Sequence, residues 1–258
     1  METDKSQKKI LFLIGLGLCD EKDLPIRSID ALKTCDAIFM EDYTNLIRED
    51  TKERLEKMLS KKIISLSRED VEGERIILES AKKQNTALIV PGDPLSATTH
   101  NSLISSAKEN SIKTKVFHAS SIFSSAPAAA GLQNYKFAKT ATITFWRKNF
   151  EPDSFIDLIE NNQKINAHTL CLLDIDRELG SMRPKKALEI LFEAQRRKME
   201  RKELGAQIIS RDTKIFIVSH VGWEDEKVWT GKISEYNDEL EGPAVIIIPS
   251  KLHFMEGV

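Results

Sequence analysis

Short, continuous apolar runs alternate with amphipathic stretches through the first half of the chain, and this alternation constrains the fold more than any other feature of the sequence. Ile10–Ile14 and Ala87–Val90 are the clearest apolar runs, and Ala37–Met40 and Lys115–Phe117 are shorter strand-like segments. A strand with one face in water alternates apolar and polar residues, whereas a strand buried on both faces is apolar throughout. The runs are of the second kind, which is typical of a parallel sheet covered by helices on both faces. We therefore predict an α/β fold.

The stretches between these runs have the residue spacing of helices. In this half of the chain the sequence predicts helices over Ser28–Cys35, Lys52–Leu59, Glu74–Lys83 and Thr98–Lys108. Ser28 is of a residue type that commonly caps a helix N-terminus, so we expect it to begin the first of them.

The second half of the chain repeats the alternation more loosely. Its strand-like segments and its one long helical segment are Ala141–Phe145, Thr169–Leu173, Lys214–Ser219, Lys227–Thr230 (a short antiparallel strand), Ala244–Ile248 and the helix Pro184–Lys202. Between the halves, Ser120–Gly131 is small, apolar and nearly uncharged, which suits a packed crossover better than a solvated linker. The predicted architecture is two α/β domains, residues 1–131 and 132–258.

Composition and charge argue against several classes of protein. The 258 residues include 38 basic and 40 acidic ones, for a formal net charge of −2, so binding to nucleic acid through a general basic field is not expected. The N-terminal segment is charged and lacks the apolar core of a signal peptide, and no apolar run is long enough to span a bilayer. The widely spaced Cys19, Cys35 and Cys171 suit a reducing compartment better than disulfides or zinc. We expect a cytoplasmic protein with no membrane or nucleic-acid partner and no bound metal.

Two loops that follow predicted strands are candidates for ligand binding, and the first is Gly15–Leu18. Glycine there permits a sharp turn or the close approach of a ligand to the backbone, and ligands of open α/β sheets bind at the carboxyl ends of the strands. The loop departs from the dinucleotide-binding motif because Asp20 stands where the third glycine would be, and it lacks the lysine and hydroxyl of a P-loop. An ordinary strand–loop turn fits this pattern as well as a cofactor loop does.

The second candidate loop is Pro91–Pro94, where a Gly-Asp pair lies between two prolines after the strand Ala87–Val90. The prolines restrict the backbone, and the Asp93 carboxylate is then directed toward the edge where ligands bind. It suits hydroxyl or amine groups of a ligand. The alternative is a rigid turn with a solvated aspartate. Since the glycine and the prolines mainly set the turn and the carboxylate need not be buried in the core, we expect its removal to affect ligand binding more than folding.

Signatures of other chemistries are lacking. The sequence has no nucleophile-elbow motif and no Cys or His spacing of a metal site. The histidines are dispersed along the chain: His100, His118, His168, His220 and His253. We interpret each as a core or rim residue rather than a base. Glu41, Asp42 and Tyr43 follow the second predicted strand and could border a pocket at the same edge, although plain loop residues are the simpler interpretation.

A series of segments, in order along nearly the whole chain, resembles the diphthine synthases of the tetrapyrrole-methylase superfamily. They are LFLIGLGLCDEKDL (11–24), EDYT (41–44), LSREDVE (66–72), PGDPLSATTH (91–100), SSI (120–122), GLQNYKFAK (131–139), HTLCLLDI (168–175) and PSKLHFMEG (249–257). Each segment alone is a weak signal, but the ordered set is specific within the superfamily.

The resemblance implies two α/β domains with a cofactor cleft between them, and a homodimer. It implies S-adenosylmethionine as the methyl donor and, as the acceptor, the amine of the modified histidine of translation elongation factor 2 in diphthamide biosynthesis. Carried over position by position, the cofactor-binding residues are Leu18, Asp93, Ser96, Ser121, Ile122, Leu173, Val221 and Ala244. No residue is identified as catalytic, because methyl transfer from a sulfonium to an amine depends mainly on alignment of the reacting atoms.

Two departures concern the second half of this set. The family commonly has Ala-Arg-Ala-Gly where this chain has Ser219–Gly222, and it commonly has histidine at the position of Ala244. The alternatives are a methyltransferase of the same fold that acts on a tetrapyrrole or on ribosomal RNA, and a non-catalytic domain that binds S-adenosylmethionine. The two departures favour the non-catalytic domain, whereas the intact Gly15–Leu18 and Pro91–Pro94 loops oppose it.

Overall fold

The computed structural model describes residues 9–41, 47–176 and 178–256. The chain divides into two compact units, Met1–Ser121 and Ile122–Val258, and each is described by itself. The division lies ten residues before the expected one (131 − 121). Helix α6, Ile122–Ala129, accounts for the difference, because the segment after it folds back onto it. The Leu132 N–H donates to Pro127 O at 2.8 Å.

The elements of the first unit are β1 Ile10–Gly15, η1 Glu21–Asp23, α1 Ile26–Lys33, β2 Ala37–Glu41, α2 Thr51–Leu59, β3 Ile64–Leu66, α3 Arg68–Glu72, α4 Arg75–Lys83, β4 Thr86–Val90, α5 Asn101–Glu109 and β5 Lys113–Phe117. Those of the second unit are α6, η2 Asn134–Lys136, β6 Ala141–Ile143, α7 Ser154–Lys164, β7 Thr169–Leu173, β8 Ile175–Asp176, β9 Gly180–Ser181, α8 Pro184–Glu200, β10 Lys214–Ser219, β11 Lys227–Lys232, η3 Ile233–Glu235 and β12 Ala244–Ile248.

The strands of the first unit form one parallel sheet in the order β3-β2-β4-β1-β5. β1 lies between β4 and β5, so that Ile14 is paired with Ile89 on one side and with Phe117 on the other. The parallel sheet predicted for this half of the chain is confirmed. Its topology brings the carboxyl ends of β1, β4 and β5 to the same edge.

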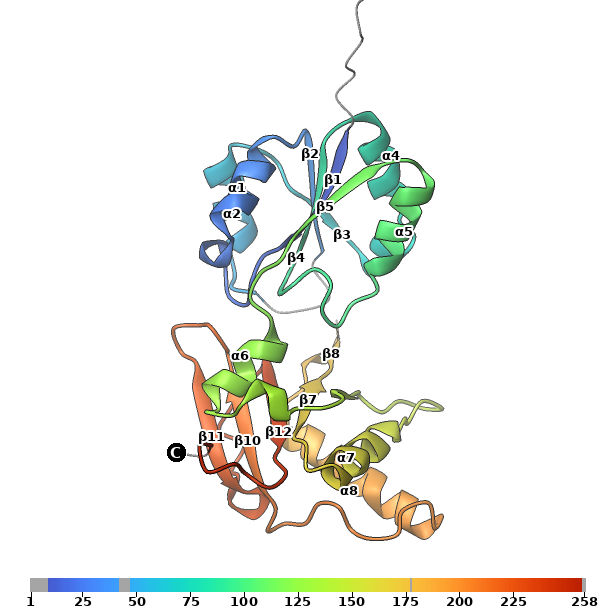
Figure 1. Ribbon diagram of the computed structural model, residues 1–258, viewed down its shortest axis with the longest axis vertical. Helices are drawn as coiled ribbons and strands as arrows, with labels where there is room; N and C mark the ends of the chain where they lie inside the picture. The colour runs from blue at the N-terminus through green and yellow to red at the C-terminus, as the bar shows by residue number, and fades with distance from the viewer. Residues whose placement is uncertain (1–8, 42–46, 177, 257–258) are drawn as a thin grey trace, which may run out of the picture. The chain divides into compact units, whose positions relative to one another are not determined.

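Helices cover both faces of this sheet (Figure 1). On one face α1 and α2 pack against it through side chains that include Leu32 and Leu55. On the other face α3, α4 and α5 do so through side chains that include Ile77 and Leu103. The predicted α/β class is therefore correct for this unit, and the layers explain why its strands are apolar throughout.

The second unit contains a mixed sheet in the order β11-β10-β12-β7-β6. β6 and β7 are parallel, and the other neighbours are antiparallel. The antiparallel strand expected at Lys227–Thr230 is β11, which pairs with β10. Helices α7 and α8 pack on the sheet through Phe155, Ile159 and Leu191. Because β12 runs against both of its neighbours, its start lies beside the ends of β7 and β10.

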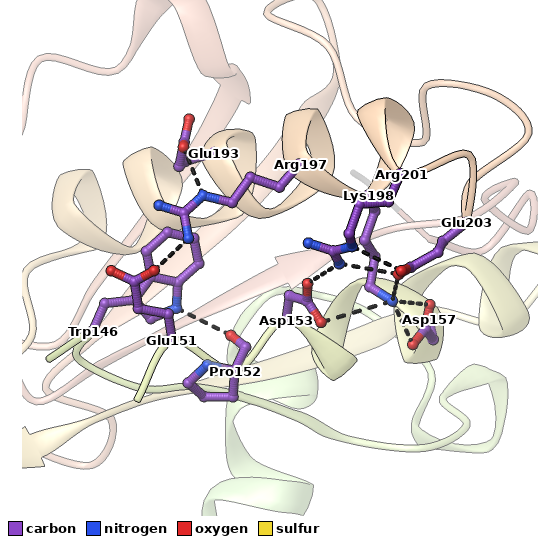
Figure 2. Close-up of polar contacts among 10 residues, drawn as sticks. All are labelled: Trp146, Glu151, Pro152, Asp153, Asp157, Glu193, Arg197, Lys198, Arg201 and Glu203. Carbon is purple, nitrogen blue, oxygen red and sulfur yellow. Dashed lines mark hydrogen bonds and ion pairs between the residues drawn. The ribbon is translucent and has the colours of Figure 1, made fainter. Parts of the chain in front are cut away.

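An ion-pair network joins the start of α7 to the end of α8 (Figure 2). Lys198 lies at its centre and is 5% exposed. Its Nζ is 2.8 Å from Asp157 Oδ1, 3.5 Å from Glu203 and 3.7 Å from Asp153. Arg201 bridges the carboxylates of Asp153 and Glu203. Carboxylates at a helix N-terminus and cations at a C-terminus also complement the helix dipoles.

Two findings concern the helices. Ser28 does not cap α1, contrary to expectation, because the helix begins at Ile26 after the extended backbone of Pro25 and Ser28 is buried within its first turn. Among the helices of the described ranges, none is long and apolar enough to cross a membrane.

Candidate functional site

The two candidate loops lie side by side at the carboxyl edge of the first sheet. Gly17 N–H donates to Gly92 O at 3.2 Å, and Gly92 N–H donates to Gly17 O at 2.6 Å. This antiparallel bridge continues beyond the ends of β1 and β4. Gly15–Leu18 and Pro91–Pro94 therefore form one surface.

Three strand ends converge at Gly15. A Cβ at this position would lie 2.7 Å from Gly92 O, 2.8 Å from Ala119 Cβ and 2.9 Å from Pro94 Cδ. Gly17 has a φ of +96°, a conformation that side-chain-bearing residues rarely adopt. The glycines of the first loop are thus needed for close packing and for the turn itself.

Asp93 is buried and joins the loop after β4 to the segment after β5. Its Oδ1 accepts from Leu95 N–H at 3.0 Å and from Ser96 Oγ at 3.2 Å. Its Oδ2 accepts from His118 Nδ1 at 2.7 Å and from Ala119 N–H at 3.3 Å. Burial alone would raise the pKa of Asp93, but the hydrogen bonds from Leu95 and His118 outweigh it, so the pKa lies below its usual range. The carboxylate is therefore ionised and structurally engaged, which corrects the expectation that it need not be buried.

Two further residues of the predicted set lie in this unit. Leu18 is buried, and its N–H donates to Asp23 Oδ2 at 2.9 Å. Ser121 is half-buried and ends the unit, two residues after the amide that donates to Asp93. The structure thus brings Leu18, Asp93 and Ser96 together at the sheet edge.

A buried ionisable pair contacts the loop Pro91–Pro94 through the carbonyl of Pro94. Glu41 ends β2 and is 0% exposed, and its Oε2 lies 3.0 Å from Nε2 of His100, which is 3% exposed. His100 Nδ1 donates to the carbonyl of Pro94 at 3.0 Å. Burial alone would lower the pKa of His100, but the hydrogen bond and charge of Glu41 outweigh it and raise that pKa. Glu41 is therefore a buried partner of the loop, while Asp42 and Tyr43 lie outside the described residues.

In the second unit, three predicted residues lie at one edge of the sheet. Leu173 ends β7, Val221 follows the end of β10, and Ala244 begins β12. All three side chains are buried. Ile122 is half-buried and begins helix α6.

The segment that departs from the family pattern forms a hydrogen-bonded corner beside the start of β12. His220 has a φ of +52°, and its N–H donates to Pro243 O at 2.9 Å. Its Nε2 lies 2.9 Å from Gly242 O and its Nδ1 lies 2.8 Å from Asp225 Oδ2. The ring stacks on Trp223 with centroids 4.8 Å apart. The contacts of His220 with Gly242 and Pro243 therefore link the end of β10 to the segment that precedes β12.

Three residues that build the edge of the first sheet were not among the predicted site residues: Asp23, His100 and His118. The two histidines are a core and a rim residue, as expected from the sequence. The rule that ligands bind at strand ends selects Gly15–Leu18 and Pro91–Pro94. Applied to β5 as well, it identifies His118, which is the first residue after that strand. Within residues 9–41, 47–176 and 178–256, no group of three or more His, Cys, Asp or Glu side chains is arranged to hold a metal ion.

Comparisons with known proteins agree with this arrangement. The family model described as Tetrapyrrole (Corrin/Porphyrin) Methylases matches residues 11–237. A diphthine synthase of Methanocaldococcus jannaschii is 40% identical over 254 residues, which cover 96% of each chain. One of Methanothermobacter thermautotrophicus is 36% identical over 250 residues, 96% of this chain and 92% of that one. A crystal structure of a diphthine synthase superposes with a TM-score of 0.84 at 29% identity, covering 96% of this chain and 92% of the other.

Proposed function

This chain belongs to the diphthine synthases of the tetrapyrrole methylase family, and from that premise we propose that it transfers methyl groups from S-adenosylmethionine to translation elongation factor 2. It is a methyltransferase of diphthamide biosynthesis and uses a methyl-donor cofactor. We propose the identity of the donor, S-adenosylmethionine, and that of the acceptor, the amine of the modified histidine.

The observation that carries the proposal is the glycine-bearing edge of the first sheet. At Gly92 the φ is +73°, and a Cβ built there meets no atom within 4 Å. The backbone beside Asp93 is thus open to a ligand, which is the use of glycine at strand ends in open α/β sheets. A nucleoside-bearing donor fits an edge of this kind.

We assign the donor to Leu18, Asp93, Ser96 and Ser121 in the first unit. In the second unit we assign it to Ile122, Leu173, Val221 and Ala244. When bound, the donor supplies an already activated methyl group on a sulfonium. The chain's own residues then have to hold and orient the ligands, and orientation of that kind lowers a barrier by about 7–11 kcal/mol. The buried apolar members of the set also keep water away from the reacting atoms.

We further propose that the protein is a cytoplasmic homodimer. Cys19, Cys35 and Cys171 are buried free thiols, and such thiols suit a reducing compartment. The homodimer rests on the family resemblance.

The test is a methylation assay. The protein is incubated with labelled S-adenosylmethionine and with elongation factor 2 that carries the unmethylated histidine intermediate. Label should enter elongation factor 2 that carries the intermediate. It should not enter elongation factor 2 whose target histidine has been replaced. Parallel reactions with a tetrapyrrole and with ribosomal RNA should remain unlabelled. Label in either of these, with none in elongation factor 2, would overturn the proposed acceptor.

A further inference from the structure

His118 differs from three more buried histidines in the state of its ring nitrogens. In His100, His168 and His220 both nitrogens have partners within the chain. His118 makes one hydrogen bond, through Nδ1, and its side chain is 68% exposed. Among the described residues, Nε2 of His118 has no partner.

The partner of Nδ1 determines which nitrogen carries the proton. Asp93 is ionised, and an ionised carboxylate only accepts hydrogen bonds. Nδ1 of His118, at 2.7 Å from Asp93 Oδ2, must therefore be the donor. In the neutral ring Nε2 is then an acceptor, directed away from the carboxylate and accessible to solvent. A buried carboxylate that orients an imidazole in this way is the arrangement by which many enzymes hold a histidine base.

The position of the pair links it to the site. His118 follows β5, and the next residue, Ala119, packs against Gly15 and donates to Asp93. The imidazole thus stands at the same strand-end edge as the two glycine-bearing loops. Histidine is the side chain best suited to exchanging protons in the physiological pH range.

We propose that His118 is the proton acceptor for the amine that receives the methyl group, with Asp93 holding its ring; this rests on the proposed amine acceptor. The protonated amine gives one proton to Nε2, which becomes an imidazolium. The nitrogen lone pair then forms the bond to the methyl carbon, and the electron pair of the broken carbon–sulfur bond stays on sulfur. The imidazolium releases its proton to water through its exposed edge, which restores the base for another transfer.

The first experiment reads the ring itself and does not depend on activity. Long-range ¹H–¹⁵N NMR of the whole protein distinguishes the two neutral tautomers of histidine. In its neutral form His118 should be protonated at Nδ1 and unprotonated at Nε2, with its signals assigned by their loss in His118→Gln. A proton on Nε2 would overturn the proposal.

The second experiment compares His118→Gln and His118→Ala with His253→Gln, a matched change at an exposed histidine of the second unit. Single-turnover methylation of elongation factor 2 should slow by about 10²- to 10⁴-fold in the His118 variants, while the affinity for S-adenosylhomocysteine in calorimetry stays within about threefold. Added imidazole should restore a measurable part of the rate to His118→Ala and none to His118→Gln. His253→Gln should behave as wild type.

The outcomes separate the two proposals. If the wild-type protein labels no elongation factor 2, the proposed function fails, and the tautomer measurement still decides whether the Asp93–His118 pair exists as described. If wild type is active and the His118 variants keep their rate, the proposal is overturned. It is also overturned if rate and donor affinity fall together without rescue by imidazole, because His118 is then a structural partner of Asp93.

Discussion

Gly15 and Gly92 differ in what a methyl group would meet, and this difference allows a paired prediction. At Gly15 a Cβ would press on the Gly92 carbonyl and on Pro94 and Ala119 at less than 3 Å. We expect Gly15→Ala to lower the free energy of unfolding by about 1–3 kcal/mol, as overpacking does. Urea denaturation checks this, and a wild-type midpoint would contradict the packing described here.

Gly92→Ala should behave differently. A Cβ at position 92 meets no atom within 4 Å. The expected loss in the free energy of unfolding therefore comes from the strain of a φ of +73° and is about 1–2 kcal/mol. The added methyl group occupies the open space that we assign to the donor. Affinity for S-adenosylhomocysteine should therefore fall in calorimetry even after the loss of stability is taken into account. Unaltered affinity would move the donor away from this loop.

Asp93 has two roles that one substitution should expose together. Asp93→Ala removes the acceptor of two backbone amides and of His118. We expect a loss of stability of about 1–3 kcal/mol and an affinity for the methyl donor about 5- to 150-fold lower. A melting curve and calorimetric titration with S-adenosylhomocysteine measure the two effects. A large drop in melting temperature with unchanged affinity would make Asp93 purely a turn residue.

The Glu41–His100 pair predicts a pH dependence of stability. The pKa of His100 is higher in the folded than in the unfolded protein. Its contribution to the free energy of unfolding is therefore fully present below the unfolded-state pKa of about 6.5. That contribution is lost as the pH rises through the folded-state pKa. The free energy of unfolding should therefore decline above about pH 6.5. Glu41→Gln removes the charge that raises this pKa and should flatten the decline, while His253→Gln should leave it intact. An equally steep decline in Glu41→Gln would contradict the assignment.

At the scale of elements, the predictability of each segment follows from its burial. β7, β10 and β12 were predictable to the residue, because these central strands are mostly buried and predominantly apolar. β3 was not predictable, since it has three residues and Ile64 is half exposed. Helix α6 was also missed as a helix, because it contains Pro127 and no charged residue, and so lacks the polar face that marks a helix in a sequence.

The Lys198 network makes a prediction about how α7 and α8 are held together. Lys198→Met keeps the buried stem and removes the cation, leaving Asp153, Asp157 and Glu203 close to one another. We expect stability to fall by about 1–3 kcal/mol and part of the loss to be recovered in about 1 M salt, which screens the repulsion. Lys164→Met, which removes an exposed pair with Glu160 on α7, is the control and should change stability by less than about 0.5 kcal/mol. Equal losses in the two variants would assign the network no special role.

At the scale of the whole molecule, the sequence was sufficient to place the two loops at one edge and not sufficient to show how they are joined. The carboxyl ends of parallel strands lie at one edge whatever the strand order, so the presence of Leu18 and Asp93 at the same edge followed from the fold class alone. The contact of His118 with Asp93 depends on β1 lying between β4 and β5, and the contacts of His100 depend on β2 lying beside β4. Both also depend on the exact register. Neither strand order nor register is encoded in the local pattern of a uniformly apolar strand.

The last prediction concerns assembly. The chain has a mass of 29.2 kDa, so the proposed homodimer should scatter light as a particle of twice that mass. Stable interfaces of this kind bury at least about 1,000 Å², and the molar mass should then stay constant on dilution through the micromolar range. Methylation of elongation factor 2 at each concentration is the accompanying measurement. A monomer with full specific activity would overturn the homodimer and leave the methyltransferase assignment standing, whereas activity that falls with dissociation would show that the site depends on the second copy.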